Sequence, residues 1–196
     1  QIQNNITGIL AAGTTGESPT LQWEEHNRLV AAVAAAAKGK CLCIAGTGSN
    51  NTQEAIEAVK HAVNAGVDAI LMVDPYYNGP SSLEIRREYY EPVVKAFPDT
   101  EFIPYIIPGR TGTQLLPEDL AILSSQYKNV GSVKEATGNI ENMKRTRKCC
   151  GDHFKILSGD DAILLQIMAD PEIKACGGIS VISIIAPKSL SDMVFM

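Results

Sequence analysis

The chain has 196 residues, of which 45% are hydrophobic and 20% are charged, and its net charge is −5. These proportions are typical of a globular protein with one sizeable core. The negative charge and the lack of a basic cluster argue against nucleic acid or an anionic membrane as a partner. No apolar run is long enough to span a bilayer.

Short apolar segments alternate along the chain with longer segments of helical periodicity. In chain order, strands are predicted at 6–12, 41–46, 68–74, 101–107, 130–134, 154–158 and 177–183. The helices predicted between them lie at 21–37, 51–66, 82–97, 117–127, 139–149 and 161–170, and another begins near Pro187. Thr20 is the expected cap of the first helix, Gly66 closes the second, and Pro92 bends or interrupts the third.

Alternating strands and helices, with nearly continuous apolar strands, predict a parallel sheet covered by helices. A doubly wound sheet and a (β/α) barrel both satisfy this pattern. The spacing of about 25 residues per unit favours the barrel, whose complete form has eight units. We therefore expect an α/β fold, a (β/α)8 TIM barrel that is incomplete, with residues 1–196 forming one partial domain of seven units.

Polar and glycine-rich segments follow every predicted strand. They are GTTGES (13–18), GTGSNN (46–51), DPYYN (74–78), YIIPGRTG (105–112), KEATG (134–138), SGDD (158–161) and GIS (178–180). Each segment alone is readily explained as a turn. Because the carboxyl ends of parallel strands meet at one rim, a single active site explains all of them together.

Lys134 stands at the end of an apolar strand, where burial would lower the pKa of its amine and make it a nucleophile. Such an amine forms a Schiff base with a ketone, and the imine then serves as an electron sink. A tyrosine hydroxyl could move the protons. The Gly-Thr-Thr-Gly turn could hold one carboxylate and a rim arginine a second. The residues thus predict carbon–carbon bond chemistry on a 2-keto acid.

The segments GTTGES, PYYN, YxxPxRTG and KEATG, in this order, resemble the dihydrodipicolinate synthase and N-acetylneuraminate lyase family. The resemblance covers essentially the whole chain and implies a (β/α)8 barrel followed by a small helical region. RTG and KEATG are similar to the synthase branch, whose members are lyases that condense pyruvate with aspartate semialdehyde in lysine (diaminopimelate) biosynthesis. The chain departs from the usual family residues at Ile106 and Gly109.

The resemblance implies four catalytic residues. Lys134 would be the Schiff-base lysine and Tyr105 the proton-relay tyrosine. Thr14 would link to Tyr105, and Tyr77 would complete the relay by reaching into the active site of a neighbouring subunit. Synthases of this family are usually homotetramers built as dimers of dimers.

The resemblance also implies four substrate-binding residues. Thr15 would help hold the pyruvate carboxylate, and Arg110 would bind the carboxylate of aspartate semialdehyde. Gly159 and Ile179 would line the pocket through their backbone. The only covalent partner is the substrate pyruvate, so no cofactor is expected. No metal site is expected either, because the three histidines lack ligand-like spacing.

Family members that respond to lysine imply a feedback site at a dimer interface, at positions matching Ser18, His26, Asn50, Glu54 and Tyr76. Trp23 adds an aromatic face that could cover the ligand. The alternative is that these residues only pack a dimer. The odd number of cysteines, five, and the lack of a CxxC pair indicate reduced thiols. We expect a cytoplasmic location, or a plastid in a plant.

Two alternatives to the synthase remain open. One is a related pyruvate-dependent aldolase or lyase, or a dehydratase of sugar-derived keto acids, although Arg110 favours the synthase. The other is a truncated relative without activity. The sequence lacks an initial Met and, by resemblance, the first β/α unit and the C-terminal helices. We therefore expect the strands at 6–12 and 177–183 not to pair with each other.

Overall fold

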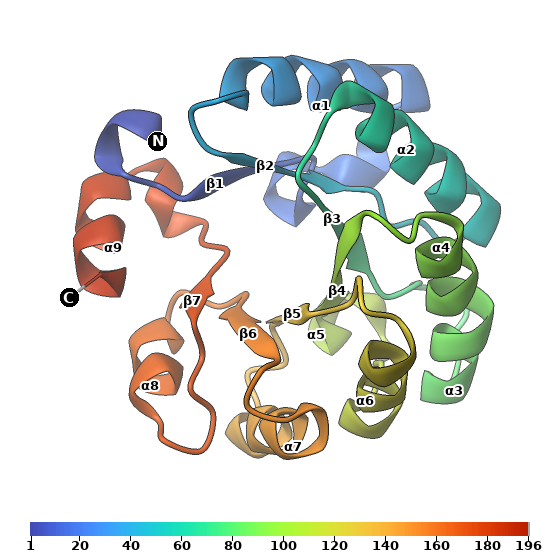
Figure 1. The fold of residues 1–196 in the computed structure, drawn as a ribbon, viewed down its shortest axis with the longest axis vertical. Helices are drawn as coiled ribbons and strands as arrows, with labels where there is room; N and C mark the ends of the chain where they lie inside the picture. The colour runs from blue at the N-terminus through green and yellow to red at the C-terminus, as the bar shows by residue number, and fades with distance from the viewer. Residues whose placement is uncertain (196) are drawn as a thin grey trace.

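The structure, a computed structural model, describes residues 1–195. Seven parallel strands form one sheet in the order of the chain, and the sheet curls around a central axis with helices on its outer side (Figure 1). The strands are β1 (Gly8–Ala11), β2 (Leu42–Gly46), β3 (Ala69–Val73), β4 (Glu101–Ile106), β5 (Ser132–Glu135), β6 (Lys155–Ser158) and β7 (Gly177–Gly178). This arrangement confirms the predicted α/β fold, an incomplete (β/α) barrel.

Nine α-helical segments are present among the described residues. They are α1 (Trp23–Ala37), α2 (Thr52–Ala65), α3 (Ser82–Glu84), α4 (Glu91–Ala96), α5 (Pro108–Thr111), α6 (Pro117–Gln126), α7 (Ile140–Cys150), α8 (Leu164–Ala169) and α9 (Pro187–Val194). A π-helical turn, η4 (Ile85–Tyr90), joins α3 to α4. Short 3-10 turns are η1 (Ile2–Asn4), η2 (Thr14–Gly16), η3 (Ser18–Thr20) and η5 (Ile182–Ile184). None of these helices has the length and apolar character needed to cross a membrane.

Alternation along the strands divides the core into two layers. Leu71 of β3 and Ile103 and Tyr105 of β4 face the inside of the barrel and pack together. Ile70 and Phe102, one residue earlier in each strand, face outward and join the larger core under the helices. The inner layer therefore carries an apolar lining up to the carboxyl ends of the strands.

Of the two predicted helix caps, one is confirmed and one is wrong. Gly66 closes α2 with a left-handed φ of 82°, and Asn51 caps its start by accepting hydrogen bonds from Gln53 and Glu54. Thr20 does not cap α1, which contradicts the prediction. Gln22 caps that helix through a capping box with Glu25, while the Thr20 hydroxyl donates to the carbonyl of Glu17 inside η3.

The region around Pro92 is a continuous helical segment rather than a broken one. Pro92 cannot donate the backbone hydrogen bond that the carbonyl of Glu88 would accept in an α-helix. That carbonyl instead accepts a hydrogen bond from the Thr52 hydroxyl at 2.9 Å. The helix widens into the π turn η4 just before the proline, and this change of register directs Tyr89 and Tyr90 into the core.

The strand predicted at 177–183 is much shorter in the structure. Only Gly177 and Gly178 pair with β6. The carboxylate of Asp161 accepts hydrogen bonds from the backbone N–H groups of Val181 and Ile182 at 3.0 and 2.8 Å. The chain therefore turns into η5 at this point and does not continue its pairing with β6. The helix predicted at 161–170 begins later, as α8, and α5 was not predicted.

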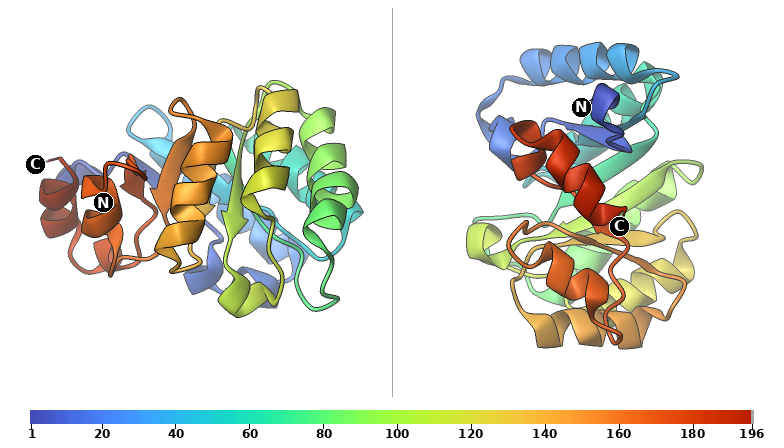
Figure 2. Two further views of the ribbon diagram at one scale, coloured as in Figure 1. Left: turned by 90° about the horizontal axis from the view of Figure 1, so that it is seen from below. Right: turned by 90° about the vertical axis from the view of Figure 1, so that its left-hand side faces the viewer.

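The sheet is open between β1 and β7, its two edge strands, as expected. The terminal helical segments meet at this edge, with α9 next to η1 (Figures 1 and 2). The Gln1 side chain donates a hydrogen bond of 2.9 Å to the carbonyl of Ser183. The N-terminal residues thus contact the segment that follows β7.

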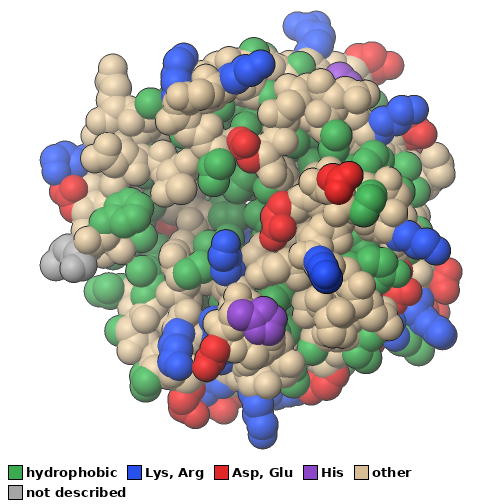
Figure 3. All heavy atoms as spheres, in the orientation of Figure 1, with side chains coloured by type: hydrophobic (Ala, Val, Ile, Leu, Met, Phe, Trp, Pro, Cys, Tyr) green, Lys and Arg blue, Asp and Glu red, His purple; other side chains and the backbone are tan. Residues whose placement is uncertain are grey.

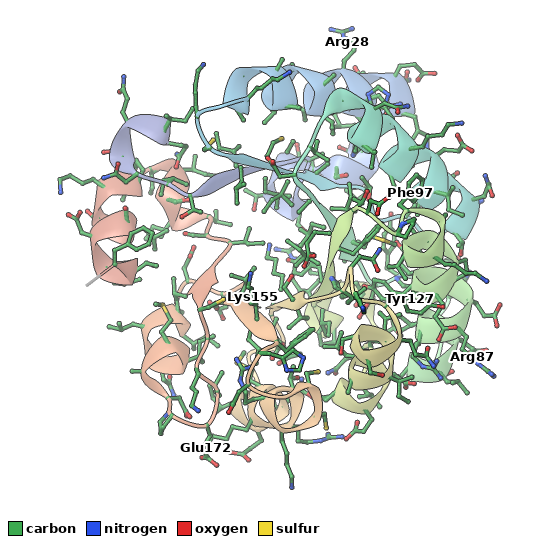
Figure 4. The ribbon with its side chains drawn as sticks, in the orientation of Figure 1. Arg28, Arg87, Phe97, Tyr127, Lys155 and Glu172 are labelled. Carbon is green, nitrogen blue, oxygen red and sulfur yellow. The ribbon has the colours of Figure 1, made fainter. Side chains whose placement is uncertain are left out.

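The periphery of the molecule is charged and its interior is apolar. Charged side chains of both signs surround the face shown in Figure 3. Arg28, Arg87 and Glu172 point away from the barrel in Figure 4. Phe97 and Tyr127, which precede β4 and β5, pack instead against the core under the helices. The segment 14–20 and α5 lie together at one end of the barrel, below the strands in the left view of Figure 2.

Candidate active site

Lys134 is a buried cation at the carboxyl end of β5. All four residues of β5 are buried, and the Lys134 side chain is 6% exposed. Within residues 1–195 it forms no ion pair shorter than 4 Å. Burial lowers the pKa of its amine to about 8, against an opposing contribution from the charge of Asp161. The neutral form of this amine is therefore far more populated near neutral pH than that of an exposed lysine.

Tyr105 lies beside Lys134 because β4 and β5 pair with these two residues in register. The Nζ atom of Lys134 is 4.1 Å from the centroid of the Tyr105 ring. Burial raises the pKa of the Tyr105 hydroxyl, while a hydrogen bond with the Thr14 side chain and the charge of Arg110 lower it. Tyr105 thus keeps its proton near neutral pH and has a hydroxyl partner for passing it on.

The two threonines follow β1 in the 3-10 turn η2. Ala12 has a left-handed φ of 56°, which ends the strand and turns the chain across the mouth of the barrel. Thr14 is half-buried and its hydroxyl lowers the pKa of Tyr105, whereas Thr15 is exposed at the rim. The turn therefore places one hydroxyl inside the site and the other at its entrance.

Arg110 lies on α5, a four-residue helix directly after β4. Pro108 begins this helix, and Gly112 ends it with a left-handed φ of 70°. Arg110 is exposed, yet its charge acts on the Tyr105 hydroxyl. It is a cation at the rim that could receive a substrate carboxylate.

Gly159 and Ile179 complete the wall around Lys134. A Cβ atom on Gly159 would lie 3.0 Å from Cε of Lys134 and 2.7 Å from Cβ of Ala136, so only glycine leaves room for the lysine stem. The N–H of Ile179 donates to the carbonyl of Ser158 at 2.8 Å. Its side chain packs with Tyr105 in the inner layer.

Tyr77 is not brought to this group. Its side chain is 90% exposed, and its backbone has a left-handed φ of 82°. Left-handed backbone is unfavourable for a bulky residue and commonly marks a functional site. The loop therefore holds Tyr77 away from the rest of its own chain.

Asp161 is a residue of this site that was not predicted from the sequence. It belongs to the SGDD segment at the end of β6, and its charge acts on Lys134. Its carboxylate also anchors the backbone of Val181 and Ile182, two and three residues beyond Ile179. The doubled aspartate at a strand end was the signal in the sequence, but nothing local distinguished Asp161 from Asp160.

A separate cavity of about 130 Å³ lies near the rim, outside the barrel. Of the six residues proposed for a lysine site, Ser18, Trp23, Glu54 and Tyr76 line it. Asn50 does not line it but accepts a hydrogen bond of 2.7 Å from the backbone of Tyr76.

His26 also lies outside the lining of this cavity. It is buried, and its Nε2 is 2.8 Å from the carbonyl of Gly46. The Trp23 ring packs edge-on against it. Ser49, which was not predicted, lines the cavity and donates a hydrogen bond of 2.6 Å to Glu54. The cavity thus presents a carboxylate, hydroxyls and an aromatic face.

Together these residues have the groups that carbonyl chemistry requires. An amine of lowered pKa lies against the apolar inner layer of the barrel, and the protonated phenol of Tyr105 lies beside it. One arginine stands at the entrance. No group of three or more potential metal ligands occurs within the described residues 1–195.

Comparison with known proteins identifies relatives over the same residues. The model of the dihydrodipicolinate synthetase family matches residues 1–196. The 4-hydroxy-tetrahydrodipicolinate synthase of Citrifermentans bemidjiense is 44% identical over 200 residues, which cover 99% of this chain and 65% of that protein. The chain thus spans slightly less than two thirds of the length of this curated relative.

Solved structures agree with this result. The dihydrodipicolinate synthase of Cyanidioschyzon merolae, solved with lysine bound, is 39% identical with a TM-score of 0.92, covering 98% of this chain and 64% of that one. A monomeric variant of dihydrodipicolinate synthase is 32% identical with a TM-score of 0.90, covering 97% and 63%. The chain belongs to the dihydrodipicolinate synthetase family.

Proposed function

We propose that the protein is a lyase that condenses pyruvate with aspartate semialdehyde to 4-hydroxy-tetrahydrodipicolinate, in the biosynthesis of diaminopimelate and lysine. The observation that carries this proposal is the unpaired, buried amine of Lys134 against the ring of Tyr105. The curated relative of C. bemidjiense bears the name of this synthase. No cofactor is needed, because the substrate itself becomes the electron sink.

The reaction begins at Lys134. Its neutral amine adds to C2 of pyruvate, and loss of water gives a protonated imine. Removal of a proton from C3 gives an enamine, which attacks the aldehyde carbon of aspartate semialdehyde while the aldehyde oxygen takes up a proton. The amino group of the product then adds to the imine carbon, closes the ring and releases Lys134.

Tyr105 moves protons in these steps, with Thr14 as its hydrogen-bonded partner. Its raised pKa keeps the hydroxyl protonated and able to donate to the departing water and the aldehyde oxygen. Thr15 helps hold the pyruvate carboxylate, and Arg110 receives the carboxylate of aspartate semialdehyde. Gly159 and Ile179 shape the wall through their backbone.

We further propose that Tyr77 acts in a neighbouring subunit of a homotetramer. Its exposure and its left-handed backbone suit a residue that projects into a partner. One relative is a monomeric variant of dihydrodipicolinate synthase. That a monomer counts as a variant supports oligomers as the usual state of the family. A cytoplasmic location suits the five cysteines, all of which are unpaired.

The cavity lined by Trp23 and Glu54 is proposed to bind lysine as a feedback inhibitor. Glu54 would receive the ligand's ammonium group, and Trp23 would cover its aliphatic stem. The C. merolae relative was solved with lysine bound. Asn50 and His26 would act indirectly, by holding Tyr76 and Trp23 in place.

The test of the proposed activity compares two reactions. The protein should consume aspartate semialdehyde only when pyruvate is present and should release a cyclic product. It should not release pyruvate from sugar-derived 2-keto acids. Cleavage of such acids, with no use of aspartate semialdehyde, would assign the protein to the aldolase alternative. No reaction in either assay would favour a relative without activity.

A further inference from the structure

Asp74 is a fully buried carboxylate that the chemistry above does not use. It follows β3, its side chain is 0% exposed, and no Lys, Arg or His lies within ion-pair distance of it in the described part of the chain. Burial raises the pKa of this carboxyl to about 7, against the hydrogen bonds from Leu115 and Tyr90. Burying a carboxylate without a cation is unfavourable, and two hydrogen bonds offset part of this free energy.

The first hydrogen bond comes from the π turn η4. The Tyr90 hydroxyl lies 2.8 Å from Oδ1 of Asp74 and 2.9 Å from the carbonyl of Met72. Tyr90 is itself fully buried, and its position depends on the widened turn before Pro92. One oxygen of the carboxylate is therefore fixed to a rigid part of the core.

The second hydrogen bond holds the segment that carries Arg110. The backbone N–H of Leu115 donates to Oδ2 of Asp74 at 3.0 Å, and Leu115 is fully buried. Between α5 and Leu115 the chain has no regular structure and contains the left-handed Gly112. The loop 107–115 starts at the end of β4, and the carboxylate thus anchors its other end.

Two further contacts attach the same loop to the segment after β3. The Thr113 hydroxyl donates to the carbonyl of Pro80, and the N–H of Leu116 donates to the Ser82 hydroxyl at 2.8 Å. The backbone N–H of Asp74 also donates to the carbonyl of Tyr105 at 3.1 Å. Asp74 therefore contacts both ends of the segment 105–115 and sets where α5 stands over the barrel mouth.

We propose that Asp74 is a positioning residue for Arg110, and that it determines affinity for the second, carboxylate-bearing substrate rather than formation of the pyruvate imine. This inference rests on the proposed function. Lys134 lies on β5, and the contact of Asp74 with Tyr105 is made by its backbone N–H, which Asp74→Asn keeps, so the first half of the reaction does not depend on the side-chain anchor. If Asp74 contributed only to stability, its substitution would change the KM values of the two substrates equally.

Asp74→Asn tests the proposal with the least change in shape. The amide removes the negative charge that strengthens both hydrogen bonds, and its NH2 group can only donate, so the anchor to Leu115 is weakened in one orientation of the amide and lost in the other. The KM for aspartate semialdehyde should rise about tenfold, the effect of one hydrogen bond to a charged group. The KM for pyruvate and the rate of borohydride-trapped adduct formation should stay within about twofold. Hydrogen exchange should accelerate in the segment 107–116 and remain unchanged in β2.

Two other variants complete the design. Asp68→Asn is the matched control, because Asp68 also accepts a backbone N–H, that of Cys43 at 2.7 Å, but lies before β3 at the opposite end of the barrel. It should change neither KM. Tyr90→Phe removes the other donor to Asp74 and should shift the KM for aspartate semialdehyde in the same direction by less. It keeps the test decisive if Asp74→Asn does not fold.

The outcomes separate the two proposals. A wild-type protein that forms no pyruvate adduct would reject the proposed function and this role with it. A wild-type protein that forms the adduct, with an Asp74→Asn variant whose two KM values are unchanged or rise together, would reject only the role of Asp74. The same holds if hydrogen exchange in the segment 107–116 is unaffected in both variants.

Discussion

Lys134 and Tyr105 occupy paired positions on adjacent parallel strands, with the lysine Nζ 4.1 Å from the centre of the tyrosine ring. The register between β4 and β5 fixes this distance, because residues paired across parallel strands point to the same side of the sheet. The proposed nucleophile and proton donor are thus positioned by the backbone of the barrel and need no mobile loop.

The pH dependence of imine formation should follow the amine of Lys134. Its pKa is lowered to about 8, and only the neutral amine attacks a ketone. The rate of adduct formation with pyruvate should rise as the pH increases from about 6 to 8 and level off above about 9. A rate that is already maximal at pH 6 would contradict the lowered pKa. Stopped-flow measurement across this range provides the comparison.

Asp161→Asn should move this pH profile to lower pH. The Asp161 carboxylate raises the pKa of Lys134, so its neutralisation leaves burial as the main influence and lowers that pKa further. The amide oxygen can still accept hydrogen bonds from Val181 and Ile182, which preserves η5. Asp160→Asn is the matched control and should leave the midpoint in place. A shift to higher pH in Asp161→Asn would refute this role.

Gly159→Ala should impair both stability and imine formation. The new methyl group would lie 2.7 Å from Ala136 and 3.0 Å from the lysine stem, so one of them must move. Such overpacking costs about 1–3 kcal/mol of unfolding free energy. Denaturant titration and adduct kinetics measure the two effects. Gly109→Ala, where an added Cβ meets open space, should change neither, and equal behaviour of the two variants would contradict the packing argument.

Subunit mixing tests whether Tyr77 acts in a neighbouring subunit. Lys134→Ala and Tyr77→Phe should each have little activity as separate preparations. When mixed and allowed to exchange subunits, they should regain activity, since a site with Lys134 can then receive Tyr77 from the other variant. If Tyr77 served its own chain, every mixed site would lack one group and the mixture would stay inactive.

Lysine binding to the rim cavity should be visible as thermal stabilisation. Millimolar lysine should raise the melting temperature of the wild-type protein, because a ligand that binds only the folded state stabilises it. Glu54→Gln removes the carboxylate proposed to hold the ammonium group and should abolish the rise. Glu57→Gln, on the same helix but outside the cavity lining, should retain it. If lysine does not raise the melting temperature of the wild-type protein, the residues that line the cavity serve only in packing.

The barrel could be predicted from local patterns in the sequence, whereas the place of Tyr105 beside Lys134 was implied by the family resemblance. Alternating apolar segments determine the strands, and the ends of parallel strands share one rim. The family resemblance is likewise confirmed by the match over residues 1–196. The assignments of individual site residues stay predictions until the variants above are measured.

The features that the sequence did not predict depend on contacts between distant residues. Asp161 curtails β7 by binding N–H groups twenty residues away along the chain, and Asp74 holds Leu115 at a separation of 41 residues. The π turn before Pro92 depends on Thr52, in another helix, satisfying a free carbonyl. None of these contacts leaves a periodic pattern in the segments involved.

The most direct test of the central claim is borohydride reduction in the presence of pyruvate, followed by intact and peptide mass spectrometry. The proposed imine predicts a mass increase of one reduced pyruvate per chain, located on Lys134. The increase should be absent in Lys134→Ala and in Lys134→Arg, because a guanidinium group is a poor nucleophile. An unchanged mass for the folded wild-type protein, or an adduct on another lysine, would contradict it.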